Sequence, residues 1–143
     1  MRPLLLIPLL ALFAPATHAG NTPAHGPHAV ATPAPPPIVR EVMVEPLPDY
    51  PGKEAMILTV EYPPGGADPV HRHDAHGFVY VLEGHIVMGV AGGREVSLGP
   101  GEAFHEGPND IHTVGRNASS SEPAKFVVFL LKDAGRPAVL PAD

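Results

Sequence analysis

From Ile38 onward the chain consists of short apolar runs rich in Val, Ile, Leu, Tyr and Phe, separated by Gly and Pro. The separators recur at intervals of about ten residues, which is typical of a domain built from short β-strands. No stretch with helical periodicity is long enough to compete. The pattern predicts a sandwich or small barrel. Its strands are expected at residues 39–44, 53–62, 70–73, 78–82, 85–90, 94–98, 103–105, 112–116 and 124–131.

Two segments with other patterns precede this region. Residues 1–19 contain Arg2, an apolar run and small residues up to Ala19, as a cleaved secretory signal peptide does. The apolar run is shorter than the ~20 residues of a membrane-spanning helix, and prolines interrupt it. We expect cleavage after Ala19 and a periplasmic or secreted protein that has no membrane association afterwards. A retained membrane anchor is the alternative.

Residues 20–37 are rich in Pro and Ala, so we expect an extended, solvated linker that leads into one β-domain at residues 38–143. The chain has no cysteine, so this domain must be stable through its core alone, without disulfides. Asp and Glu outnumber Lys and Arg by 15 to 9 among the 143 residues. This balance argues against a nucleic-acid partner, which would require a basic surface.

Two histidines, His71 and His73, stand two residues apart on one predicted strand, so their side chains share a face. A neutral imidazole is the commonest metal ligand in proteins, and two on one rigid face form half of a site for zinc or a first-row transition metal. His112 follows a second segment with Pro and Gly and can complete the site from another strand. The alternative is that these residues line a metal-free cavity.

The spacing of these residues resembles the two sequence motifs of the cupin superfamily. The first motif, G-x5-H-x-H-x3,4-E-x6-G, is matched by Gly65, His71, His73 and Gly84. The second motif is matched loosely by Pro100-Gly101, Pro108 and His112. The resemblance covers residues 43–132 and implies an all-β, cupin-type double-stranded β-helix, or jelly-roll barrel, like that of small exported single-domain cupins.

Two positions depart from these motifs. The glutamate of the first motif would stand seven residues before Gly84, where this chain has Gly77, so the usual carboxylate ligand is absent. His76 is the candidate replacement as a fourth ligand. Strict alternation along the strand would point the His76 side chain outward, whereas a turn over residues 74–77 would allow it to point toward the site. If His76 binds, the site holds histidines only and resembles sites for zinc, copper or nickel.

The second departure concerns the last asparagine of the second motif, because Arg116 stands in its place and Asn117 follows. Arg116 shares strand parity with His112 and can bind an anionic substrate group; an outward arginine paired with a surface carboxylate is the alternative. His105, followed by Glu106, can approach the pocket from a neighbouring strand, where it is a candidate for binding substrate or for orienting a ligating imidazole through a hydrogen bond; the alternative is a solvent-facing pair.

These residues and the resemblance leave several functions open. One is a metal-dependent enzyme of the dioxygenase, isomerase or lyase type, in which a divalent ion (Zn, Fe, Mn, Ni or Cu) activates a small molecule. The second is a non-enzymatic module that binds a small molecule or a metal, which the missing glutamate favours. The third is a structural or partner-binding domain with an empty barrel. By analogy, a homodimer through a sheet edge such as residues 39–44 is also expected.

Overall fold

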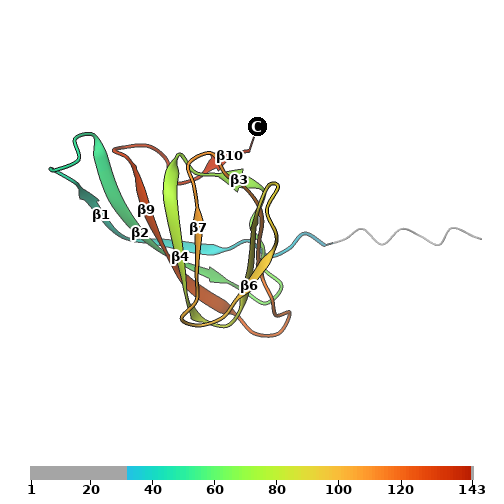
Figure 1. The fold of residues 1–143 in the computed structure, drawn as a ribbon. Helices are drawn as coiled ribbons and strands as arrows, with labels where there is room; N and C mark the ends of the chain where they lie inside the picture. The colour runs from blue at the N-terminus through green and yellow to red at the C-terminus, as the bar shows by residue number, and fades with distance from the viewer. Residues whose placement is uncertain (1–31, 143) are drawn as a thin grey trace, which may run out of the picture. The chain divides into compact units, whose positions relative to one another are not determined.

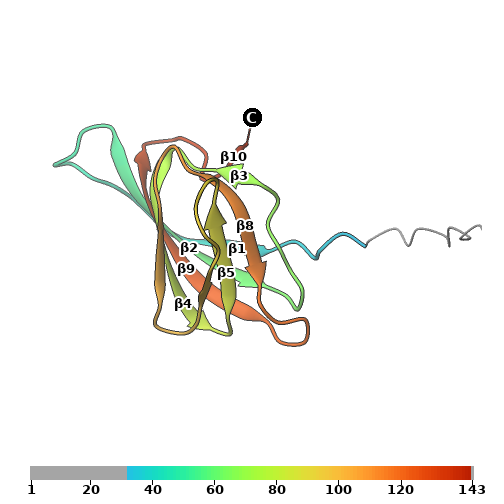
Figure 2. The same cartoon turned by 45° about the vertical axis from the view of Figure 1, so that its right-hand side comes forward.

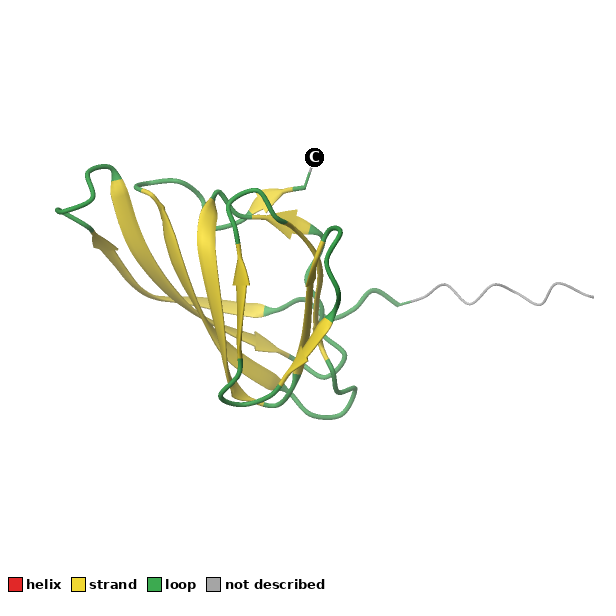
Figure 3. Cartoon of the chain, in the orientation of Figure 1, coloured by secondary structure: helices red, strands yellow, loops and turns green. Residues whose placement is uncertain are grey.

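The computed structural model describes residues 32–142, which form ten β-strands and no helix (Figures 1 and 3). The expected signal peptide at residues 1–19 and most of the expected linker at 20–37 lie outside the described part. The strands form two five-stranded sheets. Within residues 32–142, no helix is present that could cross a membrane. The all-β prediction is confirmed.

The first sheet has the strand order β1-β2-β9-β4-β7, with antiparallel pairing throughout. Its centre is the long ladder between β2 and β9, which pair over the full length of both strands. Its strands are β1 (Ile38–Pro46), β2 (Lys53–Tyr62), β9 (Ala124–Asp133), β4 (Ala75–Glu83) and β7 (Ala103–Glu106).

The second sheet has the order β10-β3-β8-β5-β6 and is also antiparallel. Figure 2 shows β8 beside β5, with the short strands β3 and β10 at one end of the barrel. The strands are β10 (Leu140–Pro141), β3 (His71–Arg72), β8 (Ile111–Asn117), β5 (Ile86–Val90) and β6 (Val96–Leu98). The two-residue strand β10 pairs only with β3 and is too short to leave a periodic signal in the sequence.

The core lies between the two sheets and follows from the two-residue period of the strands. Along β4, buried and exposed positions alternate from Ala75 as far as Leu82. The same alternation runs along β9 from Ala124 to Lys132, where exposed positions are replaced by half-buried ones. The largest fully buried side chains are Tyr62, Ile86, Met88, Leu130, Val79 and Val81. They come from both sheets and therefore hold the sheets together.

The ends of two segments differ from the sequence prediction in ways that affect the site. Strand β4 begins at Ala75, not at Phe78, so residues 75–77 continue the strand and do not form a turn. The last residues of the expected linker contact the barrel, since the carbonyl of Pro35 accepts a hydrogen bond of 3.1 Å from the backbone N–H of Ala67. Pro37 also lines the internal cavity.

Candidate metal centre

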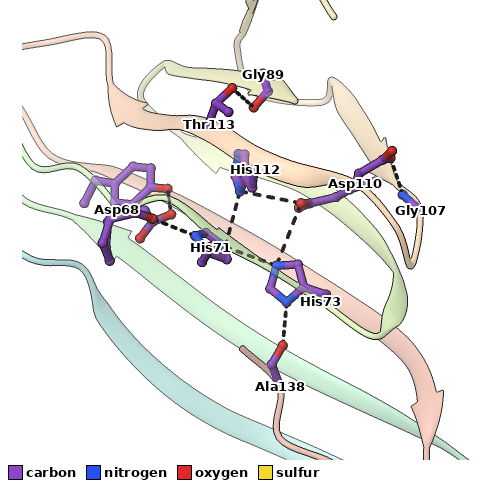
Figure 4. Close-up of polar contacts among 12 residues, drawn as sticks. Asp68, His71, His73, Gly89, Gly107, Asp110, His112, Thr113 and Ala138 are labelled. Atoms are coloured by element: carbon purple, nitrogen blue, oxygen red, sulfur yellow. Dashed lines mark hydrogen bonds and ion pairs between the residues drawn. The ribbon is translucent and has the colours of Figure 1, made fainter. Parts of the chain in front are cut away.

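Three buried histidines meet inside the barrel at the end where β3 and β8 pair. His71 on β3 is the direct cross-strand partner of His112 on β8, and His73 lies just after β3. All three are at most 7% exposed. Figure 4 shows the three rings pointing toward one another. One nitrogen from each lies within 4.8 Å of the others, so the three can contact a single ion.

The facing nitrogens have the spacing of ligands that share an ion. The Nε2 atom of His71 lies 3.2 Å from Nε2 of His73 and 3.3 Å from Nδ1 of His112. Two nitrogens that each lie about 2.1 Å from the same zinc ion are about 3 to 3.5 Å apart.

Hydrogen bonds to the backbone determine which nitrogen of two of these rings carries the proton. Nδ1 of His71 lies 2.8 Å from the carbonyl oxygen of Pro69, and Nδ1 of His73 contacts the carbonyl oxygen of Ala138. A carbonyl can only accept, so each Nδ1 must donate, and in the neutral ring each Nε2 keeps its lone pair. Two lone pairs therefore face each other at the centre, where they can share a cation or a proton but cannot bond to each other.

A fourth group, Glu106 at the end of β7, also reaches this centre. Its Oε2 atom lies 3.5 Å from Nδ1 of His112 and 3.8 Å from Nε2 of His73, and the residue is 3% exposed. In the sequence, Glu106 stands out only as the neighbour of His105. The signal that could have identified it is its cross-strand pairing with Gly77, which requires the sheet register.

Burial controls the protonation of the titratable groups here. It lowers the pKa of His112 to about 4, and the neighbouring imidazole of His71 acts in the same direction. Burial also raises the pKa of Glu106 to about 7. His112 is therefore neutral near pH 7, as a metal ligand must be.

A second carboxylate lies on another side of the triad. Asp68 lines the cavity and accepts a hydrogen bond from the hydroxyl of Tyr62. Burial raises its pKa, although the Tyr62 hydrogen bond opposes the shift. Gly115 permits this packing, since a Cβ atom there would lie 2.7 Å from Oδ2 of Asp68 and 3.1 Å from Cε1 of His112.

The cavity that contains these groups has a volume of about 240 Å³ and is mainly apolar. The histidines, Asp68 and Glu106 are its polar and ionisable lining groups. Its apolar walls come from both sheets and from the loops at one end: Pro37, Val39, Leu58, Val60, Pro69, Val79, Met88, Phe126, Val128 and Val139. A small molecule in this space would therefore contact hydrocarbon over most of its surface and polar groups at one side.

The residues present fit a divalent metal ion. One buried polar atom beside the three histidines, Oε2 of Glu106, has no hydrogen-bond partner within residues 32–142. Buried polar atoms are normally paired, and a bound ion or ordered water is one reason for an exception. Imidazole donors suit zinc, copper, iron and nickel, so the donor set agrees with the convergent lone pairs.

Two histidines named in the sequence analysis do not lie with the triad. His76 is exposed on the outer face of β4, where Nδ1 lies 3.2 Å from Nε2 of His105 on β7. Their rings stack with centroids 5.5 Å apart. His76 is therefore placed outside the barrel because β4 alternates regularly from Ala75, with no turn to change its direction. His105 points outward for the same reason, while its neighbour Glu106 points inward.

Arg116 does not enter the barrel either. Its side chain is 46% exposed and lies 3.5 Å from Oε2 of Glu95. The pairing of β8 with β5 shifts register between Gly89 and Val90, so that Thr113 is an extra residue in β8. This bulge reverses the alternation after His112. Asn117 faces inward as a result, and its Nδ2 donates to the carbonyl oxygens of Tyr62, Pro63 and Glu122.

The sequence matches the family model described as a cupin domain over residues 58–130, which is half of the chain and includes the three histidines. The chain belongs to the cupin family. A search of curated proteins gave no match. The departures from the cupin motifs now have structural explanations. The bulge at Thr113 accounts for the displaced asparagine, and Gly77 lies opposite a buried carboxylate.

Several solved structures are similar to this cupin domain. An uncharacterized conserved protein with a double-stranded beta-helix domain from Klebsiella pneumoniae has a TM-score of 0.60 and 18% identity, over 79% of this chain and 91% of its own. The polyketide cyclase RemF from Streptomyces resistomycificus has a TM-score of 0.56 and 26% identity, over 75% and 71%. The DMSP lyase DddQ from Ruegeria pomeroyi has a TM-score of 0.54 and 22% identity over 62% of this chain, which spans 43% of DddQ. These likenesses establish the fold.

Proposed function

We propose that this cupin domain binds one divalent metal ion through His71, His73 and His112 and holds a small molecule beside it. The observation that carries the proposal is the position of the two Nε2 atoms of His71 and His73, which lie 3.2 Å apart and both have an unprotonated lone pair. The hydrogen bonds from Nδ1 of each ring to the backbone hold the rings in this orientation. Holding two unprotonated nitrogens together has a cost that a shared cation removes. Preorganised ligands of this kind are typical of metal sites.

The protein's own groups would bind and orient the ligand. A bound divalent ion supplies Lewis acidity toward a substrate oxygen. The backbone carbonyls of Pro69 and Ala138 orient two of the imidazoles, and the apolar walls exclude water from the polar end of the cavity. Asp68 is placed to accept or return a proton, since burial raises its pKa and its carboxylate lines the same cavity.

The cavity restricts the class of molecule. A volume of about 240 Å³ is below the ~300 to 1,000 Å³ of sites for drug-sized ligands. We therefore propose a small organic molecule with an apolar body and one oxygen-bearing group that points toward the histidines. RemF is a polyketide cyclase and DddQ a DMSP lyase, which supports a small organic molecule without selecting a reaction.

Two forms of this function differ in whether the molecule is transformed. The buried carboxyl group of Asp68 favours an enzyme, because it lines the cavity and its pKa is raised by burial, which suits a group that accepts and returns a proton. The mainly apolar lining favours a module that only binds. Turnover in a screen of small carbonyl, carboxylate and hydroxyl compounds would support the enzyme, and saturable binding without turnover would support the module.

We also propose that the protein is exported, on the pattern of residues 1–19. Expression of the full chain in a bacterial host and mass spectrometry of the periplasmic fraction would test this. A mature chain that begins at Gly20 is expected. An uncleaved chain confined to the cytoplasm would contradict the proposal.

The metal site can be tested by elemental analysis of the untagged protein. We expect about one equivalent of metal per chain, either as purified or after incubation with zinc, iron, manganese, nickel or copper salts followed by desalting. His71→Ala and His112→Ala should lose it, whereas His76→Ala, which removes an exposed histidine, should retain it. Absence of stoichiometric metal in the wild type under every condition would refute the proposal.

A further inference from the structure

We propose that Glu106 is a direct ligand of the metal centre, so that the site is three histidines and one carboxylate. The carboxylate would come from β7, across the sheet from Gly77. This inference rests on the proposed metal site and specifies its ligand set. It replaces the histidine-only site that the absence of a glutamate at position 77 predicted.

The Glu106 carboxylate lies beside two of the three histidines. Oε2 of Glu106 lies 3.5 Å from Nδ1 of His112 and 3.8 Å from Nε2 of His73. These are two of the nitrogens that face the centre of the triad. The separations are too long for good hydrogen bonds. They are close to the separations of ligands around one ion, as are the distances between the histidine nitrogens.

Within the described residues, Oε2 of Glu106 has no partner apart from these imidazoles. Among residues 32–142, Oε2 of Glu106 has no hydrogen-bond donor, and its ion-pair contacts are only the imidazoles of His73 and His112. A carboxylate that is 3% exposed loses its hydration and is costly to keep unless a cation compensates for it. No Lys or Arg of the described residues forms an ion pair with it. A metal ion at the centre of the triad would provide the missing positive charge.

Gly77 leaves open the space that the Glu106 side chain fills. Gly77 on β4 is the direct cross-strand partner of Glu106 on β7. A Cβ atom at position 77 would lie 3.2 Å from Cγ and 3.6 Å from Oε1 of Glu106. Any longer side chain at position 77 would enter the volume that the Glu106 side chain fills. Positions 77 and 106 are therefore alternatives, since only one of them can place a long side chain beside the histidines.

The first experiment measures metal affinity, cobalt absorption and apo stability in wild type and Glu106→Gln, which removes the charge and keeps the shape. Zn²⁺ affinity, measured by competition with a chromophoric chelator, should fall at least about tenfold. The visible spectrum of bound Co²⁺ should change, because it depends on the number and kind of donors. Metal-free Glu106→Gln should unfold at the same or a higher temperature than the metal-free wild type, since an unpartnered charge has been removed.

A purely structural glutamate would give a different result. Loss of a structural contact would destabilise the metal-free protein and leave the Co²⁺ spectrum of the remaining folded fraction unchanged. Glu83→Gln, which alters an exposed glutamate at the end of β4, is the matched control and should match the wild type in all three measurements. Wild-type Zn²⁺ affinity together with an unchanged Co²⁺ spectrum in Glu106→Gln would overturn the inference.

A second experiment moves the carboxylate back across the two strands. Glu106→Gly should bind metal weakly, and the double variant Gly77→Glu/Glu106→Gly should regain at least part of the affinity, because the space is then filled from β4. A folded double variant with no recovery would overturn the claim that the two positions serve one site. If the wild type itself binds no metal, the proposed function fails. If it binds normally and only the Glu106 variants disagree, this inference alone fails.

Discussion

Nδ1 of His73 donates a hydrogen bond to the carbonyl oxygen of Ala138, 65 residues further along the chain. Ala138 lies just before β10, whose two residues pair with β3 beside the histidines. The segment after β9 is therefore part of the site. It determines which nitrogen of His73 faces the centre, and no feature of its own sequence identifies it as functional.

Removing residues 137–143 should weaken metal binding about 10- to 100-fold, which is the usual effect of losing a group that orients a ligating histidine. The apo protein should still fold, because residues 137–142 include none of the fully buried side chains of the described part of the chain. Calorimetric titration with Zn²⁺ would measure the effect, with removal of residues 142–143 as the control. Equal affinity of the wild type and the longer deletion would show that the Ala138 carbonyl is dispensable.

Lys132 and Glu54 form a buried ion pair that holds the start of this segment. The Lys132 side chain is 1% exposed, and its Nζ also donates to the carbonyl oxygen of Arg136. Lys132→Met leaves the Glu54 carboxylate without its cation and should clearly lower the free energy of unfolding. Urea denaturation would measure this loss of unfolding free energy. Lys53→Met breaks a pair whose side chains are 49% and 59% exposed and should cost at most about 1 kcal/mol. Equal losses in both variants would contradict this account.

The ion pair between Lys132 and Glu54 also makes the free energy of unfolding depend on pH in the acid range. The hydrogen bond from Lys132 holds the pKa of Glu54 below its ordinary value of 4.5. The unfolded chain therefore takes up this proton at a higher pH than the folded chain does. The stability that this carboxylate contributes is present above its unfolded pKa of 4.5 and is lost as the pH falls through the folded pKa. In Glu54→Gln, the free energy of unfolding should depend less steeply on pH below this value. Denaturation of the wild type and Glu54→Gln at several pH values between acid and neutral would test this prediction. The same pH dependence of the unfolding free energy in both proteins would contradict it.

Gly115 is the position on β8 where a methyl group should do most damage to the site. A Cβ atom there would lie 2.7 Å from Oδ2 of Asp68 and 2.8 Å from the hydroxyl of Tyr62. Gly115→Ala should therefore cost about 1 to 3 kcal/mol through overpacking. It should also weaken metal binding by displacing His112. Gly89→Ala, whose nearest contacts would be 3.4 Å or more, is the control. Thermal unfolding and Zn²⁺ titration would compare them, and equal behaviour would refute the prediction.

The sequence alone determined the fold class and the three histidines. The alternation of apolar and polar residues and the regular Gly and Pro separators specify β-strands, since these patterns depend only on local geometry. The two-residue spacing of His71 and His73 places both on one face, and both are buried. The prediction that His112 joins them required only that its strand lie beside the strand of His71, and the two residues are direct cross-strand partners.

Only the tertiary structure decided the rest of the site, because each remaining feature depends on register between distant strands. Thr113 is an extra residue where β8 pairs with β5, and it turned the side chain of Arg116 outward. Continuous pairing of β4 from Ala75 kept His76 outside the barrel. The pairing of Gly77 with Glu106 brought a carboxylate to the centre from another strand. Sequence spacing records which side chains share a strand, but the partners across a sheet are fixed only when the whole barrel closes.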